Sequence, residues 1–257
     1  MAVPHPSGSP RAKALAVRAL AAVALVAGAF AGGCAFPGGA ITAEPDAGHA
    51  PVEAPQLSVG TRWVYRARDG FRVPVLWTET REIVARDASG YTVRVTQHGP
   101  TVDGTRIERW SAPGIVDVGA LLDDETRKFK TPLERYRFPL VPGASWSQWI
   151  DNYNETTKQA GQINHYVRVG GWDRVTTPAG TFDAIRLRVL MRLDDQEFWR
   201  DPTTCNDVIW YAPAVGAPVR EEKNAEYRER SDPRDGLDVV PVQHALLELE
   251  SYTPGPR

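Results

Sequence analysis

The chain has 257 residues, of which 42% are hydrophobic and 24% are charged, and its formal net charge is −2. A balance of 30 basic against 32 acidic residues provides no basic surface for nucleic acid, so we expect no nucleic-acid partner. Two cysteines are too few for a disulfide framework.

The first segment of the chain has the order of an export signal. Arg11, Lys13 and Arg18 are the charged residues of its opening stretch, and residues 19–36 carry no charge. A basic stretch followed by a short apolar stretch and small residues is typical of a secretory signal peptide. We therefore expect the domain that follows to be exported.

Small residues precede the first cysteine: Ala31, Gly32 and Gly33 stand directly before Cys34. At this point the sequence resembles a bacterial lipoprotein signal, in which such a cysteine is lipidated and becomes the first residue of the mature protein. The family usually has leucine at the position of Ala31. The resemblance implies a signal peptide over residues 1–33, lipidation of Cys34 and a membrane as partner of the lipidated N-terminus.

Two other interpretations of this segment stay open. Its 18 uncharged residues are just enough to span a bilayer, which would leave an uncleaved anchor, and ordinary cleaved secretion would leave no anchor. The run is dominated by Ala and Gly and is broken by Pro-Gly-Gly at residues 37–39, which favours the lipoprotein. Loss of residues 1–33 removes three of the 30 basic residues and no acidic residue, so the mature charge is −5.

The expected location is the cell envelope, with the protein anchored by its lipid. By resemblance to lipoproteins in general, Ala35 rather than aspartate after the cysteine suggests the outer membrane of a diderm host, on the side that faces the periplasm.

Residues 34–56 are predicted to be a disordered Pro/Gly-rich tether. The segment contains Pro37, Pro45, Pro51 and Pro55 among Gly, Ala and acidic residues, with few large apolar groups. Such a stretch cannot bury enough surface to offset the entropy of ordering its backbone.

From Leu57 onward the hydrophobic pattern has a period of two residues. Trp63, Tyr65 and Ala67 alternate with Arg62, Val64, Arg66 and Arg68, and the same alternation recurs at residues 91–95 and 185–191. This pattern is typical of strands with one apolar face, and tight-turn sequences such as the one at 178–180 separate them. We predict a single mainly β domain over residues 57–257, an antiparallel curved sheet in a sandwich or an open or closed barrel. Few short helices are expected, at residues 120–130 and 242–249.

Two segments are predicted to be irregular. Residues 139–154 begin at a proline, contain Pro142, Gly143 and the pair Trp146 and Trp149, and we interpret them as a loop with exposed or half-buried aromatic rings. Residues 221–238 are almost wholly charged, and we interpret them as a solvated strand edge followed by a mobile loop.

Motifs with known chemistry are absent from the sequence: it has no nucleophile elbow, phosphate-binding loop, dinucleotide fingerprint or zincin helix. No histidine has a second His or a Cys at zinc spacing, and Cys205 has no adjacent base that would mark a nucleophile. We therefore expect no cofactor, no metal site and no enzymatic activity.

Carboxylates offer the one visible route to catalysis. Asp194, Asp195 and Glu197 follow a regular strand beside Trp199, and two carboxylates across a cleft can hydrolyse glycosides. A strand that ends in Asp-Asp is also an ordinary polar turn, which is the preferred interpretation. The acidic residues of 232–238 could offer oxygens to calcium, but their spacing matches no known loop.

Aromatic residues are more distinctive, because all eight tryptophans fall between residues 63 and 210. Most of those on strand-like stretches are expected to be core residues. A concave apolar pocket is the functional alternative, since ligand sites are lined by aromatic groups with few polar ones. The candidate ligand or partner surface consists of Trp63, Tyr65, Trp146 and Trp149.

Three blocks resemble a group of uncharacterised bacterial envelope proteins. The blocks are GTRWVY at residues 60–65, TPAGTFDAIR at 177–186, and IWYAP at 209–213 followed by the stretch from Val215 to Arg220. They cover roughly residues 57–220. The resemblance implies a curved, β-rich envelope domain with no established activity, and a distant likeness to the open barrels of lipid-binding lipoproteins.

The sequence thus leaves three functions to compare. The first is a non-catalytic binding module for an apolar small molecule or an envelope protein. The second is a structural or assembly lipoprotein without a ligand pocket, and the third is a hydrolase that uses the carboxylates of residues 194–197.

Overall fold

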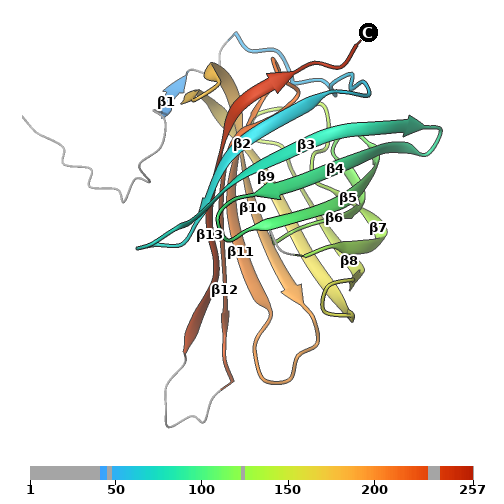
Figure 1. Cartoon of the computed structure of the whole chain (residues 1–257), viewed down its shortest axis with the longest axis vertical. Coiled ribbons are helices and arrows are strands. Elements are labelled where there is room, and N and C mark those ends of the chain that lie inside the picture. Colours follow the sequence, from blue (N-terminus) through green and yellow to red (C-terminus); the bar gives the residue numbers. More distant parts are fainter. Residues whose placement is uncertain (1–40, 45–47, 123–124, 231–237, 257) are drawn as a thin grey trace, which may run out of the picture. The chain divides into compact units, whose positions relative to one another are not determined.

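The computed structural model describes residues 41–44, 48–122, 125–230 and 238–256. They form thirteen strands (Figure 1): β1 (Ile41–Glu44), β2 (Arg62–Asp69), β3 (Val75–Asp87), β4 (Gly90–His98), β5 (Asp103–Ala112), β6 (Ile115–Gly119), β7 (Arg127–Glu134), β8 (Ser145–Asn154), β9 (Gln159–Thr177), β10 (Gly180–Asp194), β11 (Thr203–Ala212), β12 (Ala217–Arg228) and β13 (Val239–Thr253). The predicted signal peptide and Cys34 lie outside the described residues and stay predictions.

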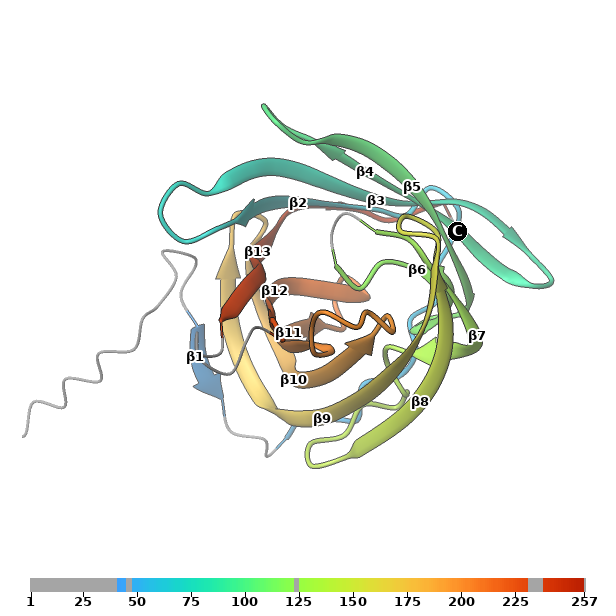
Figure 2. The ribbon, with the colours of Figure 1, turned by 90° about the horizontal axis from the view of Figure 1, so that it is seen from below.

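The strands from β2 to β13 form a closed antiparallel barrel. Neighbours in the chain pair with one another, β13 pairs with β2, and the pairing of β8 with β9 completes the ring (Figure 2). β1 pairs with the far end of β9, where Ile41 faces Val175. The predicted antiparallel β fold is confirmed, and its closed form leaves the strands of the ring paired on both sides.

Bends in the long strands allow the sheet to close. Register shifts occur in β10 at Ile185/Leu187, in β11 at Trp210/Tyr211, in β12 at Ala225/Glu226 and in β13 at Leu249/Ser251. A bulge bends its strand and increases the local twist, so shifts in four successive strands curve this wall of the barrel.

The period-two pattern sets which side chains point inward. In β10, Leu187, Val189 and Met191 are buried, whereas Arg188, Leu190 and Arg192 between them are exposed. This is the alternation that a strand with one solvated face requires. The turn at residues 178–179 connects β9 to β10, and Gly180 adopts a positive φ of 134° there.

The two predicted helices are wrong. Residues 127–130 belong to β7 and residues 242–249 belong to β13, and the described residues contain no helix. In β13 the neighbours Leu246 and Leu247 are both buried, so the segment lacks the alternation of a half-exposed strand. Pairing on both sides, with β12 and β2, overrides the local pattern. Among the described residues, no helix has the length and hydrophobicity needed to cross a membrane.

The two predicted irregular segments are largely strands. β8 covers residues 145–154, and β12 extends through Arg228 into the charged segment. Glu221 is buried rather than solvated, because Arg81 reaches its carboxylate across the barrel interior. The predicted mobile loop falls mostly on residues 231–237, which lie outside the described residues.

Ordered chain extends into the range expected to be tether. Val52 is buried and exchanges backbone hydrogen bonds with Leu140, at 3.0 Å and 2.8 Å. His49 stacks on Trp172 of β9, with ring centroids 4.1 Å apart. Residues 48–56 therefore pack on the barrel, and their prolines and glycines did not prevent this.

Candidate functional site

Trp63 and Tyr65 of β2 lie in the barrel core. The indole Nε1 of Trp63 donates to the carbonyl oxygen of Val215 at 2.8 Å, and the hydroxyl of Tyr65 donates to that of Pro218 at 3.0 Å. Arg81 lies over the Tyr65 ring, 4.6 Å from its centroid. These contacts join the first and the third sequence blocks. They also engage the polar atoms of both side chains, so neither is free to bind a ligand.

The two predicted inner faces occupy adjacent parts of the interior. Trp63 and Tyr65 belong to one buried cluster, residues Leu187, Val189 and Met191 belong to another, and Trp110 packs against both. Void space near Trp63 and Tyr65 amounts to about 30 Å³, the room that one water molecule needs. This end of the barrel is filled by side chains.

A chain of charges crosses the middle of the interior and begins at Glu79 and Arg81 of β3. Arg81 donates from Nε to Glu79 at 2.7 Å and from Nη1 to Glu221 of β12 at 2.6 Å. Gln97 of β4 donates to the second oxygen of Glu79 at 2.9 Å. The guanidinium of Arg106 lies 3.8 Å from the same carboxylate.

The chain of charges continues to Glu108 of β5. Its carboxylate accepts from Nε of Arg106 at 3.1 Å and from the indole of Trp110 at 3.0 Å. Arg135, which follows β7, approaches it at 3.8 Å. We call Glu79, Arg81, Arg106, Glu108, Arg135 and Glu221 the interior charge network.

The carboxylates of this network stay ionised although they are buried. Burial alone would raise the pKa of Glu79, but Arg81, Arg106 and the hydrogen bond from Gln97 hold it at about 2. Arginines likewise lower the pKa of Glu108 and of Glu221 against the effect of burial. The opposing charges neutralise one another, which is the condition for keeping ions in a barrel interior.

The network borders a cavity of about 60 Å³. Its other lining residues include His165 of β9, which is buried and whose Nδ1 has no hydrogen-bond partner among the described residues. Burial, and then the positive charge of Arg135, lower the pKa of His165 to about 4. The cavity holds a few water molecules at most and is too polar for an apolar chain.

A second group of ion pairs closes part of one barrel mouth. Arg127 of β7 donates to Glu125 at 2.7 Å and 2.8 Å and to Asp195 at 2.6 Å and 3.0 Å. It also donates to Asn152 of β8 at 2.9 Å. Asp195 lies on the β10–β11 link, so these bonds tie that link across the mouth to β7 and β8.

The carboxylates considered for hydrolysis therefore have other partners. Asp195 is held by Arg127 and lies 3.5 Å from Arg200, and Glu197 is bonded to Arg200. Asp194 accepts from the backbone N–H of Gln196 at 2.9 Å, as in a polar turn. The structure does not place them across a cleft from one another, and the absence of enzymatic activity stays an expectation.

The same mouth is open on its other side, between β13, β2, β3 and β4. An open cleft of about 500 Å³ lies there, and we call it the mouth cleft. Links between alternate strands of an up-and-down barrel lie at the same end, which brings the β2–β3, β4–β5 and β6–β7 links together around it. Its apolar lining residues are Phe71, Val73, Val75, Trp77, Val102, Leu122, Pro241 and Val242.

The rim of the mouth cleft exposes large apolar groups. Phe71 is 70% exposed and Val73 is 90% exposed, and Leu76 beside them is exposed as well. Phe71 stacks on His244 of β13, with ring centroids 3.8 Å apart. The cleft has the size of a small-molecule site, and an apolar rim of this kind marks a contact surface.

Trp77 contributes a hydrogen-bond donor to the cleft wall. Its ring is buried in the wall, and its Nε1 has no partner among the described residues. The polar lining groups are Gln97, Gln243, His244 and Asp69, and no Lys or Arg stands among the lining residues that the structure describes. An occupant with an apolar body and a hydrogen-bond acceptor fits this lining better than an anion does.

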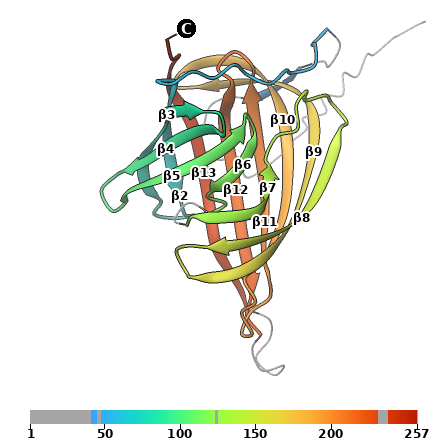
Figure 3. The ribbon, with the colours of Figure 1, turned by 90° about the vertical axis from the view of Figure 1, so that its right-hand side faces the viewer.

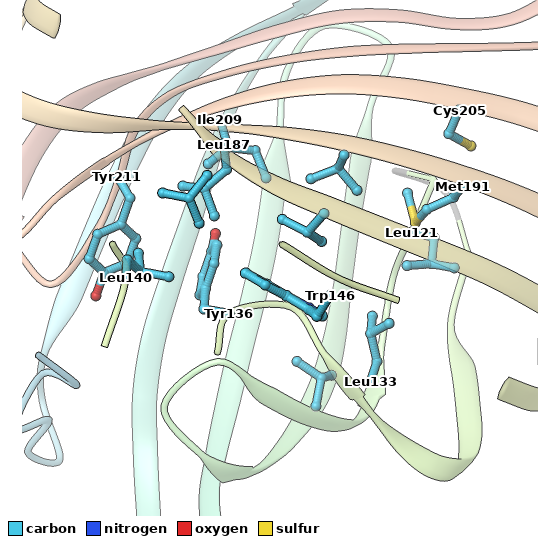
Figure 4. Packing of buried hydrophobic residues seen from close by; sticks show 14 of the residues in the cluster. Leu121, Leu133, Tyr136, Leu140, Trp146, Leu187, Met191, Cys205, Ile209 and Tyr211 are labelled. Carbon is cyan, nitrogen blue, oxygen red and sulfur yellow. The ribbon is translucent and has the colours of Figure 1, made fainter. Parts of the chain in front are cut away.

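The predicted pair Trp146 and Trp149 is not brought together. Trp146 points inward, donates to the carbonyl oxygen of Glu134 at 2.9 Å and packs in the cluster of Tyr136 and Leu133 (Figure 4). Trp149 points outward and is 70% exposed. Residues that are three apart in a strand point to opposite faces of the sheet. The loop predicted for this segment therefore missed that Trp146 and Trp149 face opposite sides.

Sequence reasoning missed the residues of the mouth cleft. The signal was present, because the run from Phe71 to Trp77, which is apolar except for Arg72, follows directly on the polar turn at Asp69 and Gly70. Nothing in the sequence shows that Val242 and Leu122 meet this run. Cys205 is buried, and burial raises the pKa of its thiol, in keeping with a plain core residue. Within the described ranges, no group of His, Cys, Asp or Glu side chains could hold a metal ion.

Comparison with known proteins identifies fold relatives only. No family model matches the sequence, and no curated protein is significantly similar to it. A crystal structure from Bacteroides fragilis, described as an exported protein with a YmcC-like fold, shares 15% identity at a TM-score of 0.48 and covers 79% of this chain and 100% of its own. A structure from Parabacteroides distasonis, described as a lipoprotein, shares 14% identity at a TM-score of 0.47 and covers 80% and 100%.

At these values the likeness carries no argument about a ligand or an activity. The resemblance of the blocks themselves stays a prediction.

Proposed function

We propose that this protein is an exported lipoprotein, anchored through Cys34, whose barrel binds an apolar small molecule in the mouth cleft. The single observation that carries the binding role is an open cleft of about 500 Å³ with an apolar lining and an indole N–H in its wall that has no partner among the described residues. Sites for small molecules have this size and this mixture of apolar lining with few polar groups.

The barrel interior favours a ligand bound at the mouth over a ligand bound in a tunnel through the barrel. The interior charge network and the filled end around Trp63 leave voids of about 60 Å³ and 30 Å³. An apolar chain that entered this region would separate ion pairs without replacing their partners, at a cost of several kcal/mol. The occupant is therefore held at the mouth, with its apolar part against Val75, Trp77 and Val242.

Chemistry of the lining narrows the class of ligand. The described lining residues include no Lys or Arg, so nothing in the cleft pairs with a phosphate or a carboxylate group. A neutral amphiphile, such as the acyl region of a lipid with an ester or hydroxyl oxygen near Trp77, matches the lining. The apolar rim also suits a hydrophobic segment of an envelope protein, which is the second candidate.

Native mass spectrometry of the full-length protein, expressed in a bacterial envelope and extracted in detergent, tests this function. We expect a co-purifying mass of lipid size on the wild type. Changing Val75 and Val242 to Glu should remove it, because two carboxylates in the cleft oppose apolar burial. Ile107→Glu on the outer face of β5 is the matched control and should retain it.

Equal adduct levels in all three proteins would show that the lipid binds elsewhere. A wild type without an adduct would exclude tight binding of an envelope lipid and favour the protein-partner candidate. Circular dichroism of the variants shows whether each keeps the β fold.

A further inference from the structure

The strands β8, β9 and β10 lie side by side in one wall of the barrel (Figure 3), and arginine and aromatic residues occupy outward positions along them. Arg168 of β9 faces Arg188 of β10 directly, and the next outward pair along the strands is Tyr166 with Leu190. The following pair is Asn164 with Arg192, and Trp149 of β8 lies beside Asn164. We call Trp149, Tyr166, Leu190, Arg168, Arg188 and Arg192 the arginine–aromatic face.

The arginines of this face are uncompensated. Like charges directly opposite one another destabilise a sheet, and Arg168 and Arg188 form such a pair. No ion pair within the described residues holds Arg168, Arg188 or Arg192. By contrast, Arg94 is bonded to Glu82 at 2.7 Å and Arg174 to Asp183 at 3.1 Å on the same outer surface.

Acidic groups near the face do not neutralise the positive charge of its arginines. Asp194 follows Arg192 by two residues, and one of its oxygens accepts from the backbone of Gln196. Asp151 of β8 is engaged by Lys130 at 3.3 Å and by Gln162 at 3.3 Å. An anionic partner would relieve the repulsion between Arg168 and Arg188 that the fold leaves in place.

The aromatic residues point to a bilayer interface as that partner. Trp149 is 70% exposed, Tyr166 is 40% exposed and Leu190 is 47% exposed, so the face presents a substantial apolar area to solvent. Tryptophan and tyrosine rings settle at the level of lipid headgroups, and the guanidinium group binds phosphate in a fixed bidentate geometry.

The first described residues, those of β1, belong to the edge of the same wall. Cys34 precedes Ile41 by seven residues, which span at most about 25 Å when fully extended. Ile41 pairs with Val175 of β9, and Arg168 lies seven residues along that strand, about 23 Å away. β1 lies beside β9 (Figure 2), so a tether of this length allows a lipid on Cys34 to reach a membrane that lies against that strand.

We propose that the arginine–aromatic face rests on the anionic phospholipid headgroups of the membrane that holds the anchor. The proposal depends on the lipid anchor of the proposed function but not on the mouth cleft. In this orientation the outer face of β8, β9 and β10 lies against the membrane. Trp149 then enters the headgroup region, and Arg168, Arg188 and Arg192 bind phosphates. The three arginines together favour the docked orientation by about a hundredfold.

The test uses the full-length processed protein reconstituted into vesicles of phosphatidylethanolamine and phosphatidylglycerol that carry brominated acyl chains. Bromine quenches tryptophans that reach the acyl boundary, and subtracting the signal of Trp149→Phe isolates Trp149. We expect this residue to be quenched in the wild type. The triple change R168E/R188E/R192E should abolish the quenching, whereas R62E/R66E/R94E, with equal charge change on the β2–β4 wall, should not.

Flotation of the vesicles tests the lipid anchor separately from the membrane contact of the arginine–aromatic face. Vesicles that float with the protein but leave Trp149 unquenched would overturn the face and preserve the anchor, and a protein partner would then be the occupant. Equal quenching in vesicles of phosphatidylcholine alone would also overturn it, because recognition would not depend on anionic lipid. Protein that fails to float would contradict the anchor, and the proposed face would fall with it. Unchanged circular dichroism confirms that the triple variants are folded.

Discussion

At the scale of single residues, the most consequential position is Cys34, whose lipid would hold the protein at the membrane. Changing Cys34 to Ser removes the thiol that carries the acyl chains, and stable membrane residence needs at least two chains. We expect the variant to leave the membrane fraction or to accumulate as an unprocessed precursor of higher mass. Fractionation and intact-mass measurement check this.

The second cysteine provides the control for that change. Cys205 is buried in β11, so Cys205→Ala should still fractionate with membranes. A Cys34→Ser protein that is processed and remains in the membrane fraction like the wild type would show that the anchor is not a lipid on this residue.

We expect His165 to make the stability of the protein depend on pH near neutrality. The pKa of this side chain falls from its usual 6.5 to about 4 in the folded protein, because burial and Arg135 disfavour the charged ring. The unfolded chain therefore takes up the proton first. Stability is full above about pH 6.5 and falls as pH drops towards 4, by about 2 kcal/mol at about pH 5.

His165→Leu removes this dependence and fills the site with an apolar group. We expect urea unfolding at about pH 7.5 and at about pH 5 to differ less in the variant than in the wild type. Glu79, whose pKa is about 2, contributes a separate loss only below its usual 4.5. An equally steep wild-type and variant profile between about pH 7.5 and 5 would assign the effect to other groups.

At the scale of elements, β8 shows what one strand does with its two faces. Trp146 packs in the core and Trp149 faces solvent. Trp146→Ala should lower the free energy of unfolding by about 3–5 kcal/mol, because it leaves a cavity. Trp149→Ala should change it by about 0.5 kcal/mol or less. Urea unfolding of both variants measures the difference, and similar losses in the two would contradict the assigned faces.

The elements also show how far the sequence determines the fold. Strands with clear alternation, such as β10 and the stretch around Trp63, were predictable because one face of each is solvated. β13 was not, since the adjacent residues Leu246 and Leu247 are both buried by their place in the ring. Local pattern carries no information about the partners on either side.

The candidate sites, like the strands, could be predicted from the sequence only in part. Trp63 and Tyr65 could be placed on one inward face, but not shown to donate their polar hydrogens to the β11–β12 hairpin. The mouth cleft joins Phe71 to Val242, and the charge network joins Arg81 to Glu221. Such pairings between residues far apart in the chain arise from closure of the barrel, which period-two patterns do not encode.

At the scale of the whole molecule, the bond between Arg81 and Glu221 links β3 to β12 across the interior. Glu221→Leu alone leaves a buried guanidinium undercompensated and should cost about 3 kcal/mol. The double variant Arg81→Met/Glu221→Leu removes both charges and should lose less than the sum of the two single changes, by at least about 1 kcal/mol. A double-mutant cycle in urea measures this coupling, and additive losses would mean that the pair contributes no joint stabilisation.

The unequal lengths of β8 and β9 have a consequence for association between copies of the chain. β8 pairs with β9 only as far as Arg168, and β1 covers the stretch from Trp172 to Val175 on the same side. The short strand thus acts as a guard over backbone groups that would otherwise template an incoming strand. β1 directly follows the N-terminal segment of the chain. A force on that segment that detaches β1 would therefore expose the edge of β9. Among the described residues, the four of β1, Ile41–Glu44, are the ones that cover this edge of β9.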